Sequence, residues 1–125
     1  MRQRILVADD DRDILAICSA YLSGAGYGVI LTEDGEQALR LIRQERPDFL
    51  VLDYFLPGMR GDEICRVVKA DQGLRHIPIC LISARISGLD ADAVRTIPCE
   101  AMLTKPFDLP VLLRKIRRLL SVPSA

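Results

Sequence analysis

Four short apolar runs of this chain each end at a polar residue suited to phosphate chemistry. These residues are Asp9 with Asp10 after the run 5–8, Asp53 after 49–52, Ser83 after 79–82, and Lys105 after 101–104. Carboxylates bind hard cations such as Mg²⁺, and a carboxylate that faces a phosphoryl group can attack it to form an acyl phosphate. A lysine ammonium pairs with phosphate oxygens, and a serine hydroxyl can donate to them. Together the four positions predict one phosphoryl-transfer site.

The elements that must position these residues are strands and helices in strict alternation. Short, nearly continuous apolar runs are typical of strands buried on both faces of a parallel sheet. The strands are expected at 4–8, 27–31, 49–52, 77–82 and 101–104. Helices are expected from about 12 to 24, at 35–44, from about 61, at 87–97 and from 108 to about 120, the last with Asp108 as its cap and Pro110 in its first turn.

Five such units predict an α/β fold, a flavodoxin-like doubly wound five-stranded parallel sheet of order 2-1-3-4-5 with helices on both faces. Ligands bind such sheets at the carboxyl ends of the strands, at the point where the strand order reverses. Here that point lies between the first and third strands, which end at Asp9 and Asp10 and at Asp53. Three neighbouring carboxylates repel one another, so we expect them to bind Mg²⁺.

Composition and length narrow the class of protein. The 125 residues predict one domain over 1–121, with 122–125 as a tail or linker stub. The chain has 17 basic residues (Lys and Arg) and 17 acidic residues (Asp and Glu), so its net charge favours neither nucleic acid nor membrane as a partner. The first apolar run is too short for a signal peptide, and none is long enough to span a membrane. Four widely spaced cysteines without a CxxC motif predict buried thiols in a reducing cytoplasm.

In four segments the chain resembles the receiver domain of bacterial two-component response regulators. The segments are Ile5–Asp11, Leu52–Gly61, Ile82–Ala84 and Leu103–Phe107. Each is weak alone, but the four in this order and at this spacing are highly specific. The resemblance implies that Asp53 accepts a phosphoryl group from a histidine kinase or a phosphotransfer protein. Such a domain is a phosphoacceptor that takes part in its own phosphorylation and dephosphorylation, not a turnover enzyme.

The resemblance also implies roles for the other site residues. The Mg²⁺ ligands would be Asp10 directly, Asp9 largely through a metal-bound water, Asp53, and the backbone carbonyl of Phe55. Ser83 would be the switch hydroxyl and Lys105 the contact to the phosphoryl group, with a cis Lys105–Pro106 bond that aims the lysine. Phe55 and Arg85 occupy positions that flank the path of the attacking water, so we expect slow hydrolysis of the acyl phosphate.

Two departures from the family pattern concern the output face, formed by the helix expected at 87–97, the strand at 101–104 and the last helix. Met102 stands where receivers usually carry an aromatic switch residue, and Pro98-Cys99 replaces a Gly-Ala pair. The contacts of a flexible methionine differ little in energy between the inactive and the active conformation. We therefore expect an active-like conformation to be partly populated before phosphorylation. The output would be an attached domain or a partner protein bound by this face.

Two alternative functions stay open on the sequence alone. The run before Asp9, with Asp11 two residues later, also fits haloacid-dehalogenase-type phosphatases, in which Asp9 would be the nucleophile and Asp11 the acid. A receiver-like interaction module with vestigial phosphorylation is the other alternative. The residue that becomes phosphorylated separates them, because a receiver is modified at Asp53 and the phosphatase at Asp9.

Overall fold

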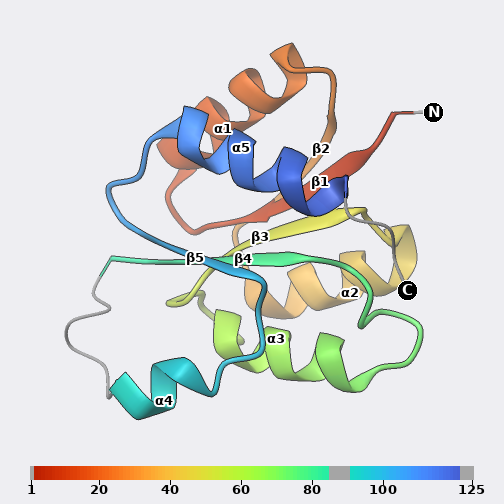
Figure 1. Ribbon diagram of the computed structural model, residues 1–125, viewed down its shortest axis with the longest axis vertical. Helices are drawn as coiled ribbons and strands as arrows, with labels where there is room; N and C mark the ends of the chain where they lie inside the picture. Colours follow the sequence, from red (N-terminus) through yellow and green to blue (C-terminus); the bar gives the residue numbers. More distant parts are fainter. Residues whose placement is uncertain (1, 85–90, 122–125) are drawn as a thin grey trace.

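Strands and helices alternate along the chain in the computed structural model, which describes residues 2–84 and 91–121 (Figure 1). The strands are β1 (Arg4–Ala8), β2 (Gly28–Thr32), β3 (Phe49–Asp53), β4 (Ile79–Ser83) and β5 (Ala101–Thr104). The helices are α1 (Arg12–Gly24), α2 (Gly35–Glu45), α3 (Gly61–Ala70), α4 (Ala91–Arg95) and α5 (Leu109–Leu120).

The five strands form one sheet of order β2-β1-β3-β4-β5, and every neighbouring pair is parallel. This is the flavodoxin-like order that the sequence predicted. In the register between β1 and β3, Ala8 pairs with Leu52. The next residue on each strand is an aspartate, so the alignment of the two strands places Asp9 beside Asp53.

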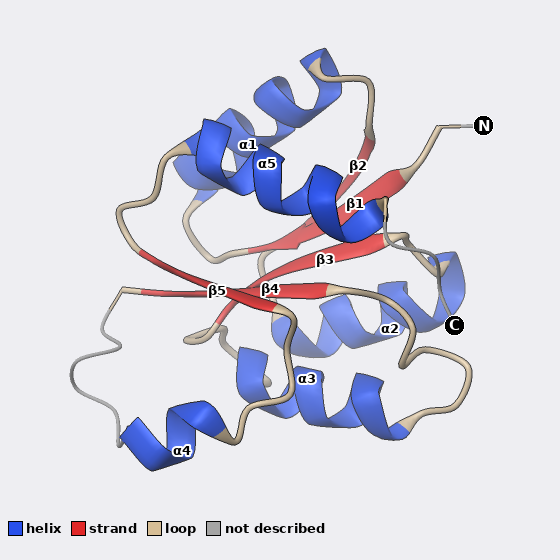
Figure 2. Cartoon of the chain, in the orientation of Figure 1, coloured by secondary structure: helices blue, strands red, loops and turns tan. Residues whose placement is uncertain are grey.

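Helices cover both faces of the sheet. Figure 2 shows α1 and α5 on one face and α2, α3 and α4 on the other. Successive residues of a strand point to opposite faces, and β1 follows this rule: Ile5 and Val7 pack in the core cluster under α1 and α5, whereas Leu6 and Ala8 pack in the cluster over α2 and α3. The near-continuous apolar runs are therefore explained by burial on both faces.

Some element boundaries differ from those predicted. The second strand is shifted by one residue, and β4 begins at Ile79 rather than at Ile77. Pro78 has no amide to donate to a ladder, although its carbonyl still accepts a hydrogen bond from Leu50 N at 3.0 Å. Of the helix expected at 87–97, the described residues show helix only over α4, and 85–90 lie outside the described residues.

The cap of α5 is also built differently from the prediction. Asp108 occupies the N-cap position, but its carboxylate makes no capping hydrogen bond. The amides that a capping side chain reaches are those of the second and third helical residues, and the second is Pro110, which has none. Asp108 is thus the N-cap residue and Pro110 lies in the first turn, as predicted, but Pro110 leaves only the Val111 amide for a capping side chain, and the Asp108 carboxylate does not bind it.

Glu100 builds the corner before β5, where the chain carries Pro98-Cys99. The Glu100 amide donates to the Ile79 carbonyl at 3.1 Å, and the Glu100 carboxylate accepts from the Ile79 amide at 2.8 Å. The second carboxylate oxygen pairs with Lys69 Nζ at 3.0 Å. One side chain thus joins the start of β4, the corner and α3 without a glycine.

Candidate functional site

The predicted carboxylates meet at the carboxyl edge of the sheet. One oxygen from each of Asp9, Asp10 and Asp53 lies within 4.8 Å of the other two. Asp9 and Asp53 are only 2% and 5% exposed, whereas Asp10 is exposed to solvent. The site therefore has two buried carboxylates and one at its mouth.

Lys105 joins the two buried carboxylates. Its Nζ lies 2.8 Å from Asp9 Oδ2 and 2.9 Å from Asp53 Oδ2. The Lys105–Pro106 peptide bond is cis, as predicted, and the Lys105 amide donates to the Ser83 carbonyl at 2.9 Å. The end of β5 is thereby tied to the end of β4, and the ammonium is aimed across β4 at β3 and β1.

Burial and pairing act in opposite directions on these groups. Burial raises the pKa of Asp9, although hydrogen bonds from Lys105 and from the Asp11 amide act to lower it. Burial acts to lower the pKa of Lys105, but hydrogen bonds to Asp9 and Asp53 outweigh it, so the pKa is raised. Lys105 therefore stays charged, while Asp9 takes up a proton more readily than an ordinary aspartate.

The charge and donor set fit a hard divalent cation. Ionised Asp9, Asp10 and Asp53 with one ammonium leave an excess of two negative charges, which an ion such as Mg²⁺ would cancel. Mg²⁺ prefers oxygen ligands, is held by one or two carboxylates, and keeps waters or phosphate oxygens in its remaining positions. The donor set at this edge of the sheet has that composition.

The loop after Asp53 is held by three backbone contacts. The Phe55 amide donates to Asp53 Oδ1 at 3.3 Å, the Tyr54 amide donates to the Ile82 carbonyl at 2.7 Å, and the Tyr54 carbonyl accepts from Gly61 N at 2.9 Å. The Phe55 side chain is 48% exposed beside the carboxylates. The phosphoacceptor candidate is thus followed by a held backbone and by an apolar ring that is half exposed to solvent.

The other residues singled out in the sequence lie on three different elements. Ser83 is buried at the end of β4 and is paired in register with Thr104 of β5. Asp11 accepts hydrogen bonds from the amides of Asp13 and Ile14 and so caps α1. Met102 is half buried against the cluster that contains Ile97. Arg85 lies outside the described residues.

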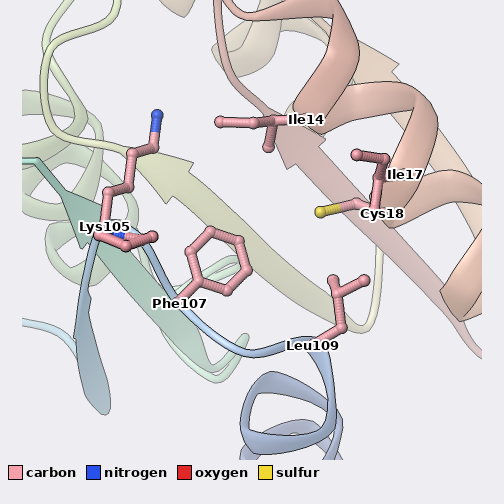
Figure 3. A pocket seen from close by; sticks show the side chains of 7 residues that line it. Ile14, Ile17, Cys18, Lys105, Phe107 and Leu109 are labelled. Atoms are coloured by element: carbon pink, nitrogen blue, oxygen red, sulfur yellow. The ribbon is translucent and has the colours of Figure 1, made fainter.

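An apolar groove opens beside Lys105, between α1 and the start of α5 (Figure 3). Its volume is about 390 Å³, and its lining is apolar except for the lysine: Ile14, Ile17, Cys18, Lys105, Pro106, Phe107 and Leu109. Ile17 is 55% exposed at its rim. The groove thus presents apolar side chains to solvent next to Lys105.

Comparison of the sequence with protein-family models identifies the family of this chain. The family model described as the response regulator receiver domain matches residues 5–117. The chain belongs to the response regulator receiver domain family. The matched span includes the carboxylates, Ser83 and Lys105, so the resemblance inferred from four short segments is confirmed.

Curated relatives carry this receiver domain within longer proteins. The chain is 38% identical over 117 residues to the DNA-binding response regulator MtrA of Mycobacterium tuberculosis, covering 94% of this chain and 50% of that protein. It is 40% identical over 126 residues to the response regulator MprA of Mycolicibacterium vanbaalenii, covering 96% of this chain and 51% of that protein. The chain therefore spans about half the length of these relatives.

Solved structures support the same fold. A putative response regulator from Chloroflexus aurantiacus matches with a TM-score of 0.88 and 30% identity, covering 98% of this chain and all of that one. The receiver domain of a sensor histidine kinase from Pseudomonas aeruginosa, described with a magnesium ion coordinated in its active-site cleft, matches with a TM-score of 0.86 and 29% identity over 98% and 100% of the two chains. That receiver domain thus holds Mg²⁺ in its active-site cleft.

Two further findings complete the site description. The four cysteines are unbridged. Cys18, Cys65 and Cys80 are buried as the sequence predicted, with burial raising the pKa of Cys65 and Cys80 to about 12, whereas Cys99 is only half buried. Within the described residues, no helix has the length and apolar character needed to span a membrane.

Sequence reasoning missed one charged cluster of this receiver domain. Asp62 is buried in the first turn of α3 and accepts hydrogen bonds from Arg60 Nε at 3.0 Å and Arg66 Nη1 at 2.6 Å. Burial acts to raise the pKa of Asp62, but the two guanidiniums outweigh it and the pKa is lowered. The spacing of an aspartate and an arginine four residues later was the only sequence signal for this cluster.

Proposed function

We propose that this receiver domain accepts a phosphoryl group on Asp53 in a reaction that requires Mg²⁺, and that it acts as a phosphoacceptor rather than a turnover enzyme. The observation that carries the proposal is the contact of Lys105 Nζ with both Asp53 and Asp9 inside the carboxylate cluster. The domain would comprise residues 1–121, with 122–125 as a tail or linker stub.

The chemistry follows from the position of each group. An Asp53 oxygen attacks the phosphorus of a phosphohistidine donor, a P–O bond forms, and the P–N bond breaks with its electrons and a proton going to the imidazole. Asp10, Asp9 through a water, Asp53 and the Phe55 carbonyl would hold Mg²⁺, which neutralises phosphoryl charge when bound. Lys105 would exchange its contact with Asp53 for one with a phosphoryl oxygen, and the Ser83 hydroxyl would donate a hydrogen bond to another phosphoryl oxygen.

The donor and the output partner occupy different faces in this proposal. A histidine kinase or phosphotransfer protein would cover the apolar groove, because Ile17 and Phe107 line it together with Lys105, whose ammonium contacts Asp53. An output domain or partner protein would bind the face formed by α4, β5 and α5, and nucleic acid would be reached only through that partner. The four unbridged thiols suit a cytoplasmic location.

The test is to find which residue is modified. Incubation with a small acyl-phosphate donor and Mg²⁺ should add one phosphoryl group, and peptide mapping after borohydride reduction should place it on Asp53. Chelation of Mg²⁺ should prevent the modification. A label on Asp9 would instead support phosphatase chemistry, and no label with any donor would support a vestigial site.

Affinity for Mg²⁺ should fall when the solution is acidified. Burial raises the pKa of Asp9, so a proton competes with the metal at higher pH than at an ordinary aspartate. Titrations by calorimetry should show weaker binding at about pH 5.5 than at about pH 7.5, a range in which unperturbed aspartates stay ionised. Asp9→Asn should bind weakly at both values with a smaller difference between them, whereas Asp13→Asn, on the exposed first turn of α1, should behave as wild type. An affinity that is constant between the two pH values would contradict this account.

Replacing Phe55 with asparagine should shorten the lifetime of the acyl phosphate. The half-exposed ring hinders the approach of water to the phosphorus, whereas an amide can orient a water. We expect hydrolysis about tenfold faster, equivalent to a barrier about 1.4 kcal/mol lower. Decay of the phosphorylated protein is followed by mass spectrometry. Leu31→Asn, which changes an exposed apolar residue on the edge strand β2, should leave the lifetime unaltered. An equal or longer lifetime for Phe55→Asn would count against steric protection.

A further inference from the structure

Tyr54 follows the phosphoacceptor candidate directly and has a firmly held backbone. Its amide donates to the Ile82 carbonyl at 2.7 Å, and its carbonyl accepts from Gly61 N at 2.9 Å. The first contact ties Tyr54 to the end of β4, and the second ties it to the start of α3. A change at Asp53 can therefore move the Tyr54 ring mainly by rotating the side chain.

The Tyr54 ring stands at an unfilled space between α3 and α4. The cavity has a volume of about 250 Å³, and its lining residues come from the two sides: Tyr54, Arg60, Asp62, Arg66, Ala93, Val94 and Ile97. Figure 1 shows α3 and α4 next to each other on the same face of the sheet. The ring is half buried and packs against the core cluster that contains Ile97.

The two walls of this cavity differ in how firmly they are held. On the α3 side, the buried Asp62 carboxylate holds the Arg60 and Arg66 guanidiniums at 3.0 and 2.6 Å. On the α4 side the lining is aliphatic, from Ala93, Val94 and Ile97. Aliphatic contacts are non-directional, so this wall can adjust to the ring while the ion-paired wall stays in place.

A chain of contacts connects Asp53 to the Tyr54 ring. Asp53 Oδ1 accepts from the Phe55 amide at 3.3 Å, and the Phe55 ring meets the Tyr54 ring edge to face with centroids 4.7 Å apart and planes at 69°. Phosphorylation of Asp53 converts its carboxylate into an acyl phosphate, which removes the carboxylate charge and adds a bulky dianionic phosphoryl group. The Phe55 amide then faces an oxygen of the acyl phosphate in place of a carboxylate oxygen, so the change at Asp53 reaches the residue whose ring packs on Tyr54.

Met102 stands where receivers usually carry an aromatic switch residue, so an aromatic side chain elsewhere in the domain can take the role of that residue. Met102 is half buried against the same core cluster, but a thioether chain has many rotamers of similar energy. Tyr54 offers a rigid ring against that cluster and has free volume beside it. A two-state response needs contacts that differ between the states, and a ring entering or leaving a cavity supplies them.

We propose that Tyr54 couples the phosphorylation of Asp53 to the position of α4, by turning its ring into the cavity lined by Arg60, Asp62, Val94 and Ile97. This inference rests on the proposed phosphorylation of Asp53. Phosphorylation releases the ring from its contact with Phe55, the ring fills the space, and the aliphatic wall of α4 repacks on it. Tyr54 is thus a positioning residue for the output face rather than a contact to the phosphoryl group.

The ring itself can be observed, because the chain has three tyrosines and no tryptophan. The full chain is labelled with fluorotyrosine, and its fluorine NMR spectrum is recorded in Mg²⁺ with and without beryllium fluoride as the phosphoryl mimic. The Tyr54 resonance, assigned by its loss in Tyr54→Phe, should shift on addition of the mimic. The resonances of Tyr21 in α1 and Tyr27 before β2 should stay in place.

The coupling is tested by amide NMR of the variants. In Tyr54→Ala, the mimic-induced shifts of the Val94 and Ile97 amides should fall to less than half of the wild-type values, while those of Asp10 and Lys105 remain. Tyr54→Phe keeps the ring and should retain the full response, which separates the effect of the ring from that of the hydroxyl.

The possible outcomes separate a failure of the coupling role from a failure of the proposed function. An unmoved Tyr54 resonance, or a full response of the α4 amides in Tyr54→Ala, would overturn the coupling role while leaving phosphorylation of Asp53 intact. Absence of any shift at the Asp10 and Lys105 amides would show that the mimic does not bind, and would overturn the proposed function together with the coupling.

Discussion

Asp53→Asn should eliminate Mg²⁺-dependent incorporation of a phosphoryl group. The amide has the shape of the carboxylate and can still accept from the Phe55 amide, but it lacks the anionic oxygen that attacks phosphorus. It also removes one of the three oxygens that would hold the cation. We expect no detectable acyl phosphate by mass spectrometry under conditions in which the wild-type domain is fully modified.

Asp62→Asn is the matched control for this loss. Asp62 is also a buried carboxylate, but it lies at the start of α3 and is held by Arg60 and Arg66, away from Lys105. This variant should be phosphorylated like the wild type. Equal labelling of Asp53→Asn and wild type would show that Asp53 is not the phosphoacceptor, and equal loss in Asp62→Asn would show that the assay reports folding rather than nucleophilic attack.

The sequence was sufficient to predict the fold, because strands that are buried on both faces of a sheet consist of nearly continuous apolar residues. The runs ending at Asp9, Asp53 and Ser83 are apolar throughout and are buried in the two core clusters, as expected of parallel strands covered on both faces. The meeting of Asp9 with Asp53 then follows from the order of the strands, and the position of Lys105 from its place after β5. Each is a consequence of topology.

The features that sequence reasoning missed depend on side-chain direction. The Glu100 carboxylate reaches the Ile79 amide and Lys69 only in one side-chain rotamer. The periodicity of the sequence does not specify a rotamer. The space beside Tyr54 results from what neighbouring side chains leave unfilled. The error at Asp108 is different, because Pro110 in the sequence already excluded one of the two amides that the cap would use.

Replacing Gly61 with alanine should both destabilise the domain and impair phosphorylation. Gly61 begins α3 and is buried where the helix meets the end of β3, and an added Cβ would lie 2.3 Å from the Asp53 carbonyl oxygen and 3.0 Å from Leu81 Cδ1. A backbone oxygen cannot move aside as a flexible side chain can. Either α3 or the end of β3 must shift, so we expect a loss of about 1–3 kcal/mol in the free energy of unfolding.

The functional effect of Gly61→Ala follows from the same clash. The shifted backbone belongs to Asp53 itself, and its carboxylate must stay within reach of Lys105 Nζ, now 2.9 Å away. Misplacement of a reacting group by about 1 Å can slow a reaction about a hundredfold, so phosphorylation should slow well beyond what partial unfolding explains. Urea denaturation and the phosphorylation rate at a temperature where the variant is folded separate the two effects.

Gly24→Ala provides the control that makes this prediction specific to position 61. Gly24 ends α1, and a Cβ there would meet no atom within 4 Å. Because alanine loses less backbone entropy on folding than glycine, this variant should be more stable than wild type by about 0.5 kcal/mol and should be phosphorylated at the same rate. If Gly61→Ala were as stable and as reactive as Gly24→Ala, the close approach of α3 to the Asp53 carbonyl would not be what fixes the phosphoacceptor in place.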